Sequence, residues 1–190
     1  FFQIFEYRGQ TIELPLLGTM QRNHNFKIVY LVLEYLAQQF GFELDKALKG
    51  LRGTFWPARC QELEPGFIVD GGHNPDGVAA LTAAMREVYP GEKFTVIFAG
   101  FKDKEVNTSL EMLQTVAKRF IFVPLHEYGR PSYSGEELGV MLDKALPYQA
   151  ADNVRHALLL ADEKPILAAG SLYLAGEILA VKNHGTAAKV

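Results

Sequence analysis

Residues 68–75 read IVDGGHNP and carry the strongest structural signal in the chain. The apolar run at 67–69 is short and bounded by turn residues, which is typical of a buried strand in a parallel sheet. The adjacent glycines allow a sharp turn and a close approach of the backbone to a ligand. Asn74 can cap a following helix, and Pro75 suits its first position, where the missing N–H costs nothing. The stretch therefore predicts a strand, a tight turn and the start of a helix.

Two side chains in this turn can do chemistry, Asp70 and His73. Both follow the carboxyl end of the predicted strand and stand beside the start of a helix. Open α/β sheets bind ligands at that edge, and helix N-termini favour anions. The alternative is an ordinary strand–turn–helix corner in which Asp70 bonds to its own loop. The stretch alone leaves both interpretations open.

Strands and helices alternate through the rest of the chain after residue 54. The predicted strands are short apolar runs at 67–69, 94–99, 120–123 and 165–169. The predicted helices have apolar residues at helical spacing and lie at about 76–88, 106–118, 135–145, 153–161 and 172–182. This alternation implies an α/β fold, a Rossmann-like and mostly parallel sheet with helices on both faces.

The first part of the chain follows a different pattern. Two apolar segments on either side of a turn at 7–10 predict a β-hairpin. A helix is predicted at 26–40, where apolar residues around most of the circumference indicate a largely buried helix. Helical spacing resumes over 44–51, and the glycine and proline of 53–57 then mark a linker.

The composition is that of a globular protein. Hydrophobic residues make up 48% of the 190 residues, which is enough for a substantial core. A formal net charge of −3 without a basic stripe argues against nucleic acid as a partner. Cys60 is the only cysteine, so neither an intrachain disulfide nor a cysteine-rich metal site can form. Without an apolar run of bilayer length or a signal-peptide pattern, we expect a cytoplasmic protein that does not bind membranes.

Two nucleotide-binding motifs are missing from the sequence. No G-x-x-x-x-G-K-[ST] phosphate loop occurs, and the turn at 70–73 lacks the third glycine of a dinucleotide fingerprint. The second absence counts against a self-sufficient Rossmann oxidoreductase. A noncatalytic nucleotide- or partner-binding module of Rossmann-like fold stays open as an alternative.

Four short elements, in this order, resemble the C-terminal part of folylpolyglutamate synthase and dihydrofolate synthase, in the Mur ligase superfamily. They are WPAR at 56–59, DGGHNP at 70–75, DKE at 103–105 and GSLY at 170–173. The usual forms in that family are W-P-G-R, D-G-A-H-N-P, D-K-D and G-S-L-Y. Ala58 replaces a glycine of the first element, so a turn glycine is lost there.

The resemblance implies an ATP-dependent ligase divided between two domains. Residues 1–53 would be a remnant of the central ATP-binding domain, and residues 54–190 the C-terminal glutamate ligase domain. Such enzymes use ATP to phosphorylate a pteroate or folate carboxylate, and the amine of L-glutamate then attacks the acyl phosphate. The phosphate loop and the Mg²⁺ ligands would lie mainly upstream. We therefore expect a monomeric enzyme of which this chain alone is an inactive part.

The resemblance also implies roles for individual residues. Arg59 would reach the ATP phosphates, because a guanidinium stays charged and offers forked donors to phosphate oxygens. Asp70 would accept bonds from the nucleotide ribose, and His73 would act near the incoming glutamate and the phosphates. Ser171 and Tyr173 would bind the glutamate, with a core position for the Tyr173 ring as an open alternative.

Two further elements have more than one interpretation. The lysines of 102–104 can attract acidic substrates while Asp103 caps the next helix, or the element can be a solvated loop. In the adenine-binding element of the family, His24 stands where an asparagine is expected. Asn23 or Asn25 would then contact the base in its place, or His24 itself would stack on it or bond to it.

Overall fold

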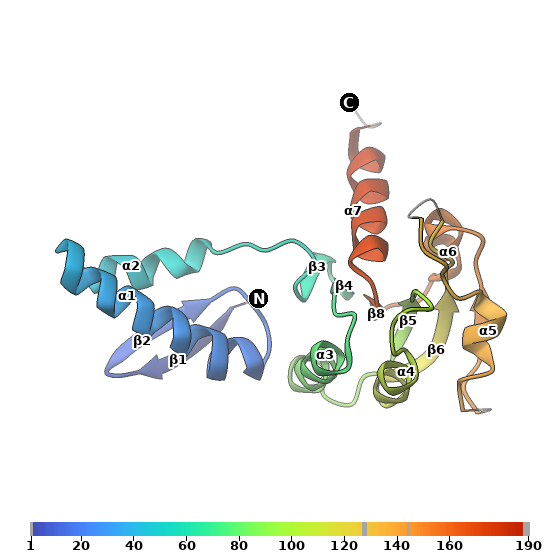
Figure 1. The fold of residues 1–190 in the computed structure, drawn as a ribbon, viewed down its shortest axis with the longest axis horizontal. Helices are drawn as coiled ribbons and strands as arrows, with labels where there is room; N and C mark the ends of the chain where they lie inside the picture. The colour runs from blue at the N-terminus through green and yellow to red at the C-terminus, as the bar shows by residue number, and fades with distance from the viewer. Residues whose placement is uncertain (1, 127–128, 144, 188–190) are drawn as a thin grey trace. The chain divides into compact units, whose positions relative to one another are not determined.

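The structure is a computed structural model that describes residues 2–126, 129–143 and 145–187. The chain forms two compact units, Phe1–Pro57 and Ala58–Val190, which we name unit 1 and unit 2 and describe separately (Figure 1). None of the helices in the described part of the chain has the length and hydrophobicity needed to cross a bilayer. The assignment of the first unit to an ATP-binding domain stays a prediction.

Unit 1 is a β-hairpin packed against two helices. Strands β1 (Gln3–Tyr7) and β2 (Gln10–Leu14) pair antiparallel, in agreement with the predicted hairpin. They are followed by the π-helical turn η1 (Gln21–Asn25), helix α1 (Phe26–Phe40), helix α2 (Leu44–Gly50) and the 3-10 turn η2 (Leu51–Gly53). The buried core of the unit consists of Ile12, Leu14, Phe26, Tyr30 and Leu48.

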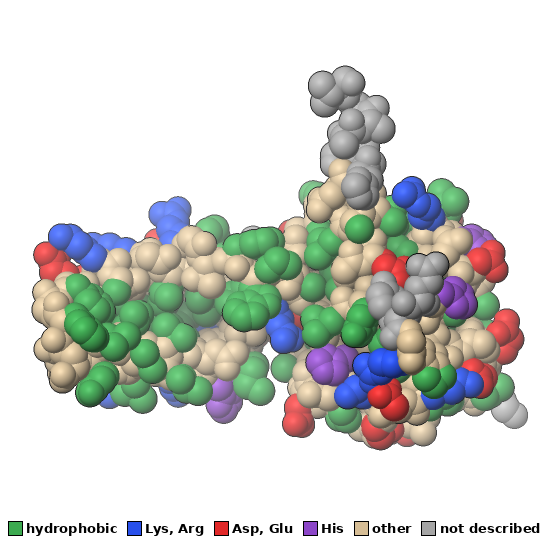
Figure 2. All heavy atoms as spheres, turned by 45° about the horizontal axis from the view of Figure 1, so that its top comes forward, with side chains coloured by type: hydrophobic (Ala, Val, Ile, Leu, Met, Phe, Trp, Pro, Cys, Tyr) green, Lys and Arg blue, Asp and Glu red, His purple; other side chains and the backbone are tan. Residues whose placement is uncertain are grey.

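Helix α1 is more exposed than the sequence suggests. Only Phe26 and Tyr30 of this helix are buried, so the prediction of a largely buried helix is wrong within unit 1. These two rings pack against Phe5 and Tyr7 of the hairpin, which covers one side of the helix. The exposed apolar side chains of the helix are Ile28, Val29, Leu31, Val32, Tyr35 and Phe40. Figure 2 shows hydrophobic side chains, in green, gathered on the surface of unit 1.

Unit 2 contains a six-stranded sheet in the order β3-β4-β8-β5-β6-β7. Only β3 (Gln61–Glu64) runs antiparallel to its neighbour. The parallel strands are β4 (Phe67–Val69), β5 (Phe94–Phe98), β6 (Ala117–Phe122), β7 (Tyr148–Ala150) and β8 (Ile166–Ala169). The helices are α3 (Pro75–Val88), α4 (Asn107–Gln114), α5 (Gly135–Gly139), α6 (Val154–Leu160) and α7 (Leu172–Ala187). The predicted α/β fold with a mostly parallel sheet is confirmed.

Helices cover both faces of this sheet because alternate strand side chains point to opposite faces. Val96 and Phe98 of β5 pack on the face covered by α3, α4 and α5, whereas Ile97 packs on the face covered by α6 and α7 (Figure 1). The chain moves in one direction through the sheet from β4 to β7 and then returns to β8. Since parallel crossovers are right-handed, this reversal places α6, which connects β7 to β8, on the opposite face.

The sequence patterns missed the two edge strands. Strand β3 reads QELE and β7 reads YQA, so neither contains an apolar run. Edge strands commonly carry polar side chains because one edge faces water, and this removes the signal. The helix predicted at 106–118 ends at Gln114, because the chain enters β6 at Ala117. The helix predicted at 135–145 ends at Gly139, and its residue 144 lies outside the described residues.

Gly170, directly after β8, stands where a side chain does not fit. Its φ is +101°, and a Cβ atom there would lie 2.6 Å from the carbonyl oxygen of Ala99 and 2.4 Å from the ring of Phe98. We predict that Gly170→Ala lowers the free energy of unfolding by about 3 kcal/mol, because backbone strain and overlap add. Urea denaturation of the chain measures this loss.

Gly176 in α7 provides the matched control for this substitution. A Cβ atom added there meets no atom within 4 Å. Gly176→Ala should therefore raise the free energy of unfolding by roughly 0.5–1 kcal/mol, the usual gain within a helix. Equal effects of the two substitutions would contradict the steric argument at Gly170.

Candidate active site

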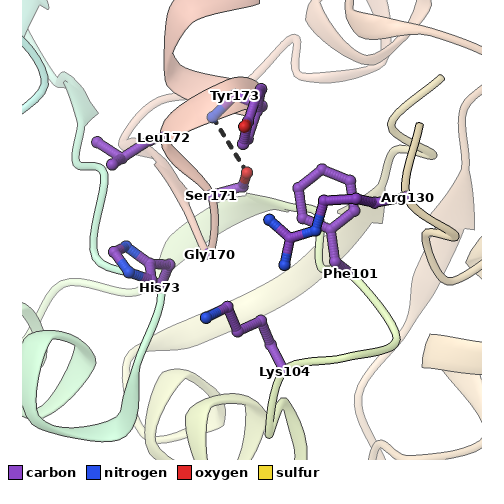
Figure 3. Close-up of a pocket in the computed structure, with 8 residues that line it drawn as sticks. All are labelled: His73, Phe101, Lys104, Arg130, Gly170, Ser171, Leu172 and Tyr173. Carbon is purple, nitrogen blue, oxygen red and sulfur yellow. Dashed lines mark hydrogen bonds between the residues drawn. The ribbon is translucent and has the colours of Figure 1, made fainter. Parts of the chain in front are cut away.

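A cavity of about 210 Å³ lies at the carboxyl edge of the sheet in unit 2. It is formed by residues from four loops, which follow β4, β5, β6 and β8. The lining residues, drawn in Figure 3, are His73, Phe101, Lys104, Arg130, Gly170, Ser171, Leu172 and Tyr173. The three residues predicted to share a pocket, His73, Ser171 and Tyr173, thus line one cavity. Their roles toward a ligand stay predictions.

The topology of the sheet explains the position of the cavity. Strands β4 and β8 are neighbours, yet α3 after β4 and α7 after β8 lie on opposite faces. The segments that follow β4 and β8 therefore diverge as they leave the sheet, and a crevice opens between them. Ligands of open α/β sheets bind at such switch points, where helix N-termini and loop donors meet.

The Asp70 carboxylate shapes the loop that carries His73. Asp70 is 5% exposed, and its Oδ1 accepts a bond from Gly72 N at 2.7 Å. Its Oδ2 accepts a second bond from Cys60 N at 2.8 Å, which ties in the segment before β3. The structure thus contains the alternative that the sequence left open, an Asp70 bonded to its own loop. Asp70 does not line the cavity, and its contact with a ribose stays a prediction.

The same arrangement affects Cys60. Burial, followed by the charge of Asp70, raises the pKa of the Cys60 thiol far above its ordinary value. The thiol therefore stays protonated and unreactive, since the thiolate is the nucleophilic form. Ala58, two residues earlier, has φ +55°, so the tight turn is kept although the family's glycine is missing. The expected loss of a turn glycine is accommodated by a left-handed alanine.

His73 presents one ring nitrogen to the backbone. Its Nδ1 lies 3.1 Å from the carbonyl oxygen of Gly71. A carbonyl only accepts hydrogen bonds, so Nδ1 carries the proton and Nε2 of the neutral ring is an acceptor. The imidazole can therefore accept a proton at Nε2. Asn74, which follows it, caps α3 through a bond from Gly77 N at 2.8 Å, as the sequence predicts.

Ser171 offers a hydrogen-bond donor to the cavity. The residue is 3% exposed, and its Oγ accepts a bond from Tyr173 N at 3.1 Å. A hydroxyl donates one bond as well as accepting, so its proton can be directed to a carboxylate. Tyr173 as a residue is 42% exposed, and its ring packs edge-on against Phe101, with centroids 5.3 Å apart. The alternative of a core position for Tyr173 is therefore wrong.

Two cations point into the cavity, Lys104 and Arg130 (Figure 3). The sequence singled out the lysine but missed the arginine, which lies in a loop without a recognisable motif. Arg130 forms an ion pair with Asp103, and its guanidinium carbon lies 4.6 Å from the centre of the Phe101 ring. The hydrogen bond from Arg130 holds the pKa of Asp103 below its ordinary value.

Other predicted residues of this region have different roles. Asp103 does not cap the next helix, because its carboxylate is directed to Arg130. The acidic side chain that bonds to the first turn of α4 is instead Glu105, whose Oε1 accepts a bond from Thr108 N at 3.1 Å. Lys102 pairs with Glu137 and does not line the cavity, so of the two lysines only Lys104 is placed to attract an acidic ligand.

The residues predicted to bind ATP do not line this cavity. Arg59 is exposed, and its guanidinium makes no ion pair with any residue that the structure describes. Asn23, His24 and Asn25 lie on the exposed turn η1 of unit 1, where Asn25 donates to Gln21 at 2.7 Å. The described residues contain no group of three or more His, Cys, Asp or Glu side chains that could hold a metal ion.

Comparison with known proteins agrees with this architecture. The chain is 28% identical over 189 residues to the folylpolyglutamate synthase of Lacticaseibacillus casei, covering 93% of this chain and 42% of that protein. It is 30% identical over 125 residues to the dihydrofolate synthase/folylpolyglutamate synthase of Bacillus subtilis, covering 64% and 29%. The fold resembles a Yersinia pestis bifunctional folylpolyglutamate synthase/dihydrofolate synthase complexed with AMPPNP and a Mn ion. That match has a TM-score of 0.76 at 16% identity and covers 96% of this chain and 45% of that chain.

The chain spans less than half the length of these relatives. Residues 58–172, which contain the cavity loops, match the family model described as "Mur ligase, glutamate ligase domain". This match covers more than half of the chain and falls on unit 2. The chain therefore belongs to the Mur ligase family and corresponds to the C-terminal region of folylpolyglutamate synthases.

Proposed function

We propose that the chain is part of an ATP-dependent ligase that adds L-glutamate to a pteroate or folate carboxylate through an acyl phosphate. The observation that carries the proposal is the cavity of unit 2. It combines two cations, an imidazole and a buried hydroxyl at the carboxyl edge of the sheet. An amino acid with two carboxylates and an amine matches this set of groups.

The cavity residues divide the work of binding the amino acid. Ser171 can donate to the α-carboxylate, and the start of α7 adds backbone donors and a favourable dipole. His73 lies across the cavity from Arg130, where Nε2 can take a proton from the ammonium group of the amino acid (Figure 3). The amine nitrogen then forms the C–N bond, and phosphate leaves with the electron pair of the C–O bond. A cavity closed to water would protect the acyl phosphate from hydrolysis.

ATP would be bound mainly outside this cavity. We propose that Arg59 reaches the phosphates, since its guanidinium is exposed and makes no ion pair with the described residues. Adenine would be contacted from the turn η1 by Asn23, His24 or Asn25. Each carboxylate oxygen of Asp70 retains a lone pair for a ribose hydroxyl, although the carboxylate is almost fully buried.

We propose that unit 1 belongs to the ATP-binding domain and that its exposed α1 surface packs against the rest of that domain. Six apolar side chains of α1 are at least 39% exposed, which is typical of a surface made for contact. The Mg²⁺ that accompanies ATP would be held by residues of the ATP-binding domain outside this chain. The described residues supply no cluster of metal ligands. We further propose that the enzyme is a monomer.

The first prediction that follows from this proposed function concerns the chain by itself. Residues 1–190 contain no phosphate loop, so we expect the isolated chain to fold without ligase activity. An assay of ATP-dependent amide formation with pteroate or folate acceptors measures this. Turnover by the isolated chain would show that the ATP site is complete within it.

The second prediction separates Arg59 from Asp70. In the ligase that contains this chain, Arg59→Ala should lower kcat/KM about a hundredfold or more with an unchanged fold, because a charged phosphate contact is lost. Asp70→Ala should instead destabilise unit 2, since two backbone N–H groups lose their acceptor. Steady-state kinetics and urea denaturation distinguish the two effects. Wild-type kinetics in Arg59→Ala would remove it from the ATP site.

The third prediction tests the amino-acid site. His73→Ala and Ser171→Ala should each raise the KM for L-glutamate about tenfold, because a hydrogen bond to a charged group is lost. The KM for ATP should change much less. Tyr173→Phe should have a smaller effect, since the ring contact with Phe101 is kept. Equal increases in both KM values would argue against a separate glutamate subsite.

A further inference from the structure

The cluster around Arg130 is held on three sides. Its guanidinium pairs with Asp103, stacks over the ring of Phe101 and interacts with the Tyr173 side chain. Phe101 in turn packs edge-on against Tyr173 and is 4% exposed. A guanidinium has five N–H donors in a rigid fork, and one carboxylate cannot use them all. Donors of Arg130 therefore remain available on the side that faces the cavity.

The two sides of the cavity differ in chemistry. Figure 3 shows the guanidinium of Arg130 and the ring of His73 on opposite sides of the cavity, with the ammonium of Lys104 between them. If the amine of the incoming amino acid reacts beside His73, the α-carbon of the amino acid lies on the same side of the cavity. The side chain of the amino acid then extends past Lys104 toward Arg130.

From this arrangement we infer that Arg130 binds the side-chain carboxylate of the incoming amino acid and that Asp103 is the positioning residue that orients Arg130. The inference rests on the proposed function, whose amino-acid site it makes more specific. Asp103 does not line the cavity. It acts by fixing one edge of the guanidinium while Phe101 fixes its face.

The charges of the cluster support this division of roles. Lys104 and Arg130 carry two positive charges, and Asp103 cancels one of them. Together these three side chains carry a net charge of +1, which suits an L-glutamate anion. The Asp103–Arg130 pair is partly exposed, with side chains 54% and 34% accessible, so it contributes little to the stability of the fold. Its removal should therefore affect binding more than folding.

The test is a kinetic comparison in the ligase that contains this chain. Asp103→Asn should raise the KM for L-glutamate about tenfold and leave the KM for ATP within twofold, because the orientation of one charged contact is lost. The preference for L-glutamate over L-glutamine, measured as a ratio of kcat/KM values, should fall by a similar factor. Asp103→Glu keeps the charge and should recover part of both losses.

Asp162→Asn provides the matched control. Asp162 pairs with Arg119 at 2.5 Å, at the opposite end of the sheet, and Arg119 also holds the pKa of Asp162 below its ordinary value. This substitution removes the same kind of ion pair and should leave both KM values unchanged. An Asp103→Asn enzyme with wild-type KM and selectivity for glutamate would overturn the inference while leaving the proposed function intact. A wild-type ligase that adds no glutamate would overturn both.

Discussion

The candidate site depends on one buried carboxylate. Asp70 leaves water almost completely on folding, which is unfavourable for a charge unless hydrogen-bond donors replace the solvent. Two backbone N–H groups do so, one from its own turn and one from the segment before β3. Their bonds hold the turn after β4 in one conformation, and a bond from Gly170 N to Gly72 O joins it to the end of β8. The position of His73 relative to Ser171 follows from these contacts.

The parts of the fold that the sequence predicts are those with strong local signals. The strand, turn and helix start at 67–75 were predictable because apolar periodicity, glycine freedom and helix capping act over a few residues. Strands β3 and β7 were not predictable, because the polar sequence of an edge strand cannot be distinguished from that of a loop. The exposure of α1 also escaped prediction, since an apolar helix surface does not reveal how much of it other elements cover.

The residues of the candidate site likewise fall into those that the sequence predicts and those that it does not. His73, Ser171 and Tyr173 belong to short elements that can be recognised, and the order of strands in the sheet brings their loops together. Arg130 lies in a loop after β6 without such an element, and only the three-dimensional structure places it beside Phe101. The role of Asp103 escaped prediction for a related reason. An acidic residue shortly before a helix is usually a cap, and its long-range partner is invisible in the local sequence.

The place of β8 in the sheet also has a consequence for how the chain folds. Of the strands that the structure describes, β8 comes last in the sequence, yet it lies between β4 and β5 and pairs with both. Until it arrives, the two older parts of the sheet have no contact through their backbone hydrogen bonds. Pairing between segments this far apart in sequence has a large entropic cost of loop closure and is therefore slow. During synthesis, the edges of β4 and β5 therefore stay unpaired until β8 is made, and unpaired strand edges make a newly made chain prone to aggregation.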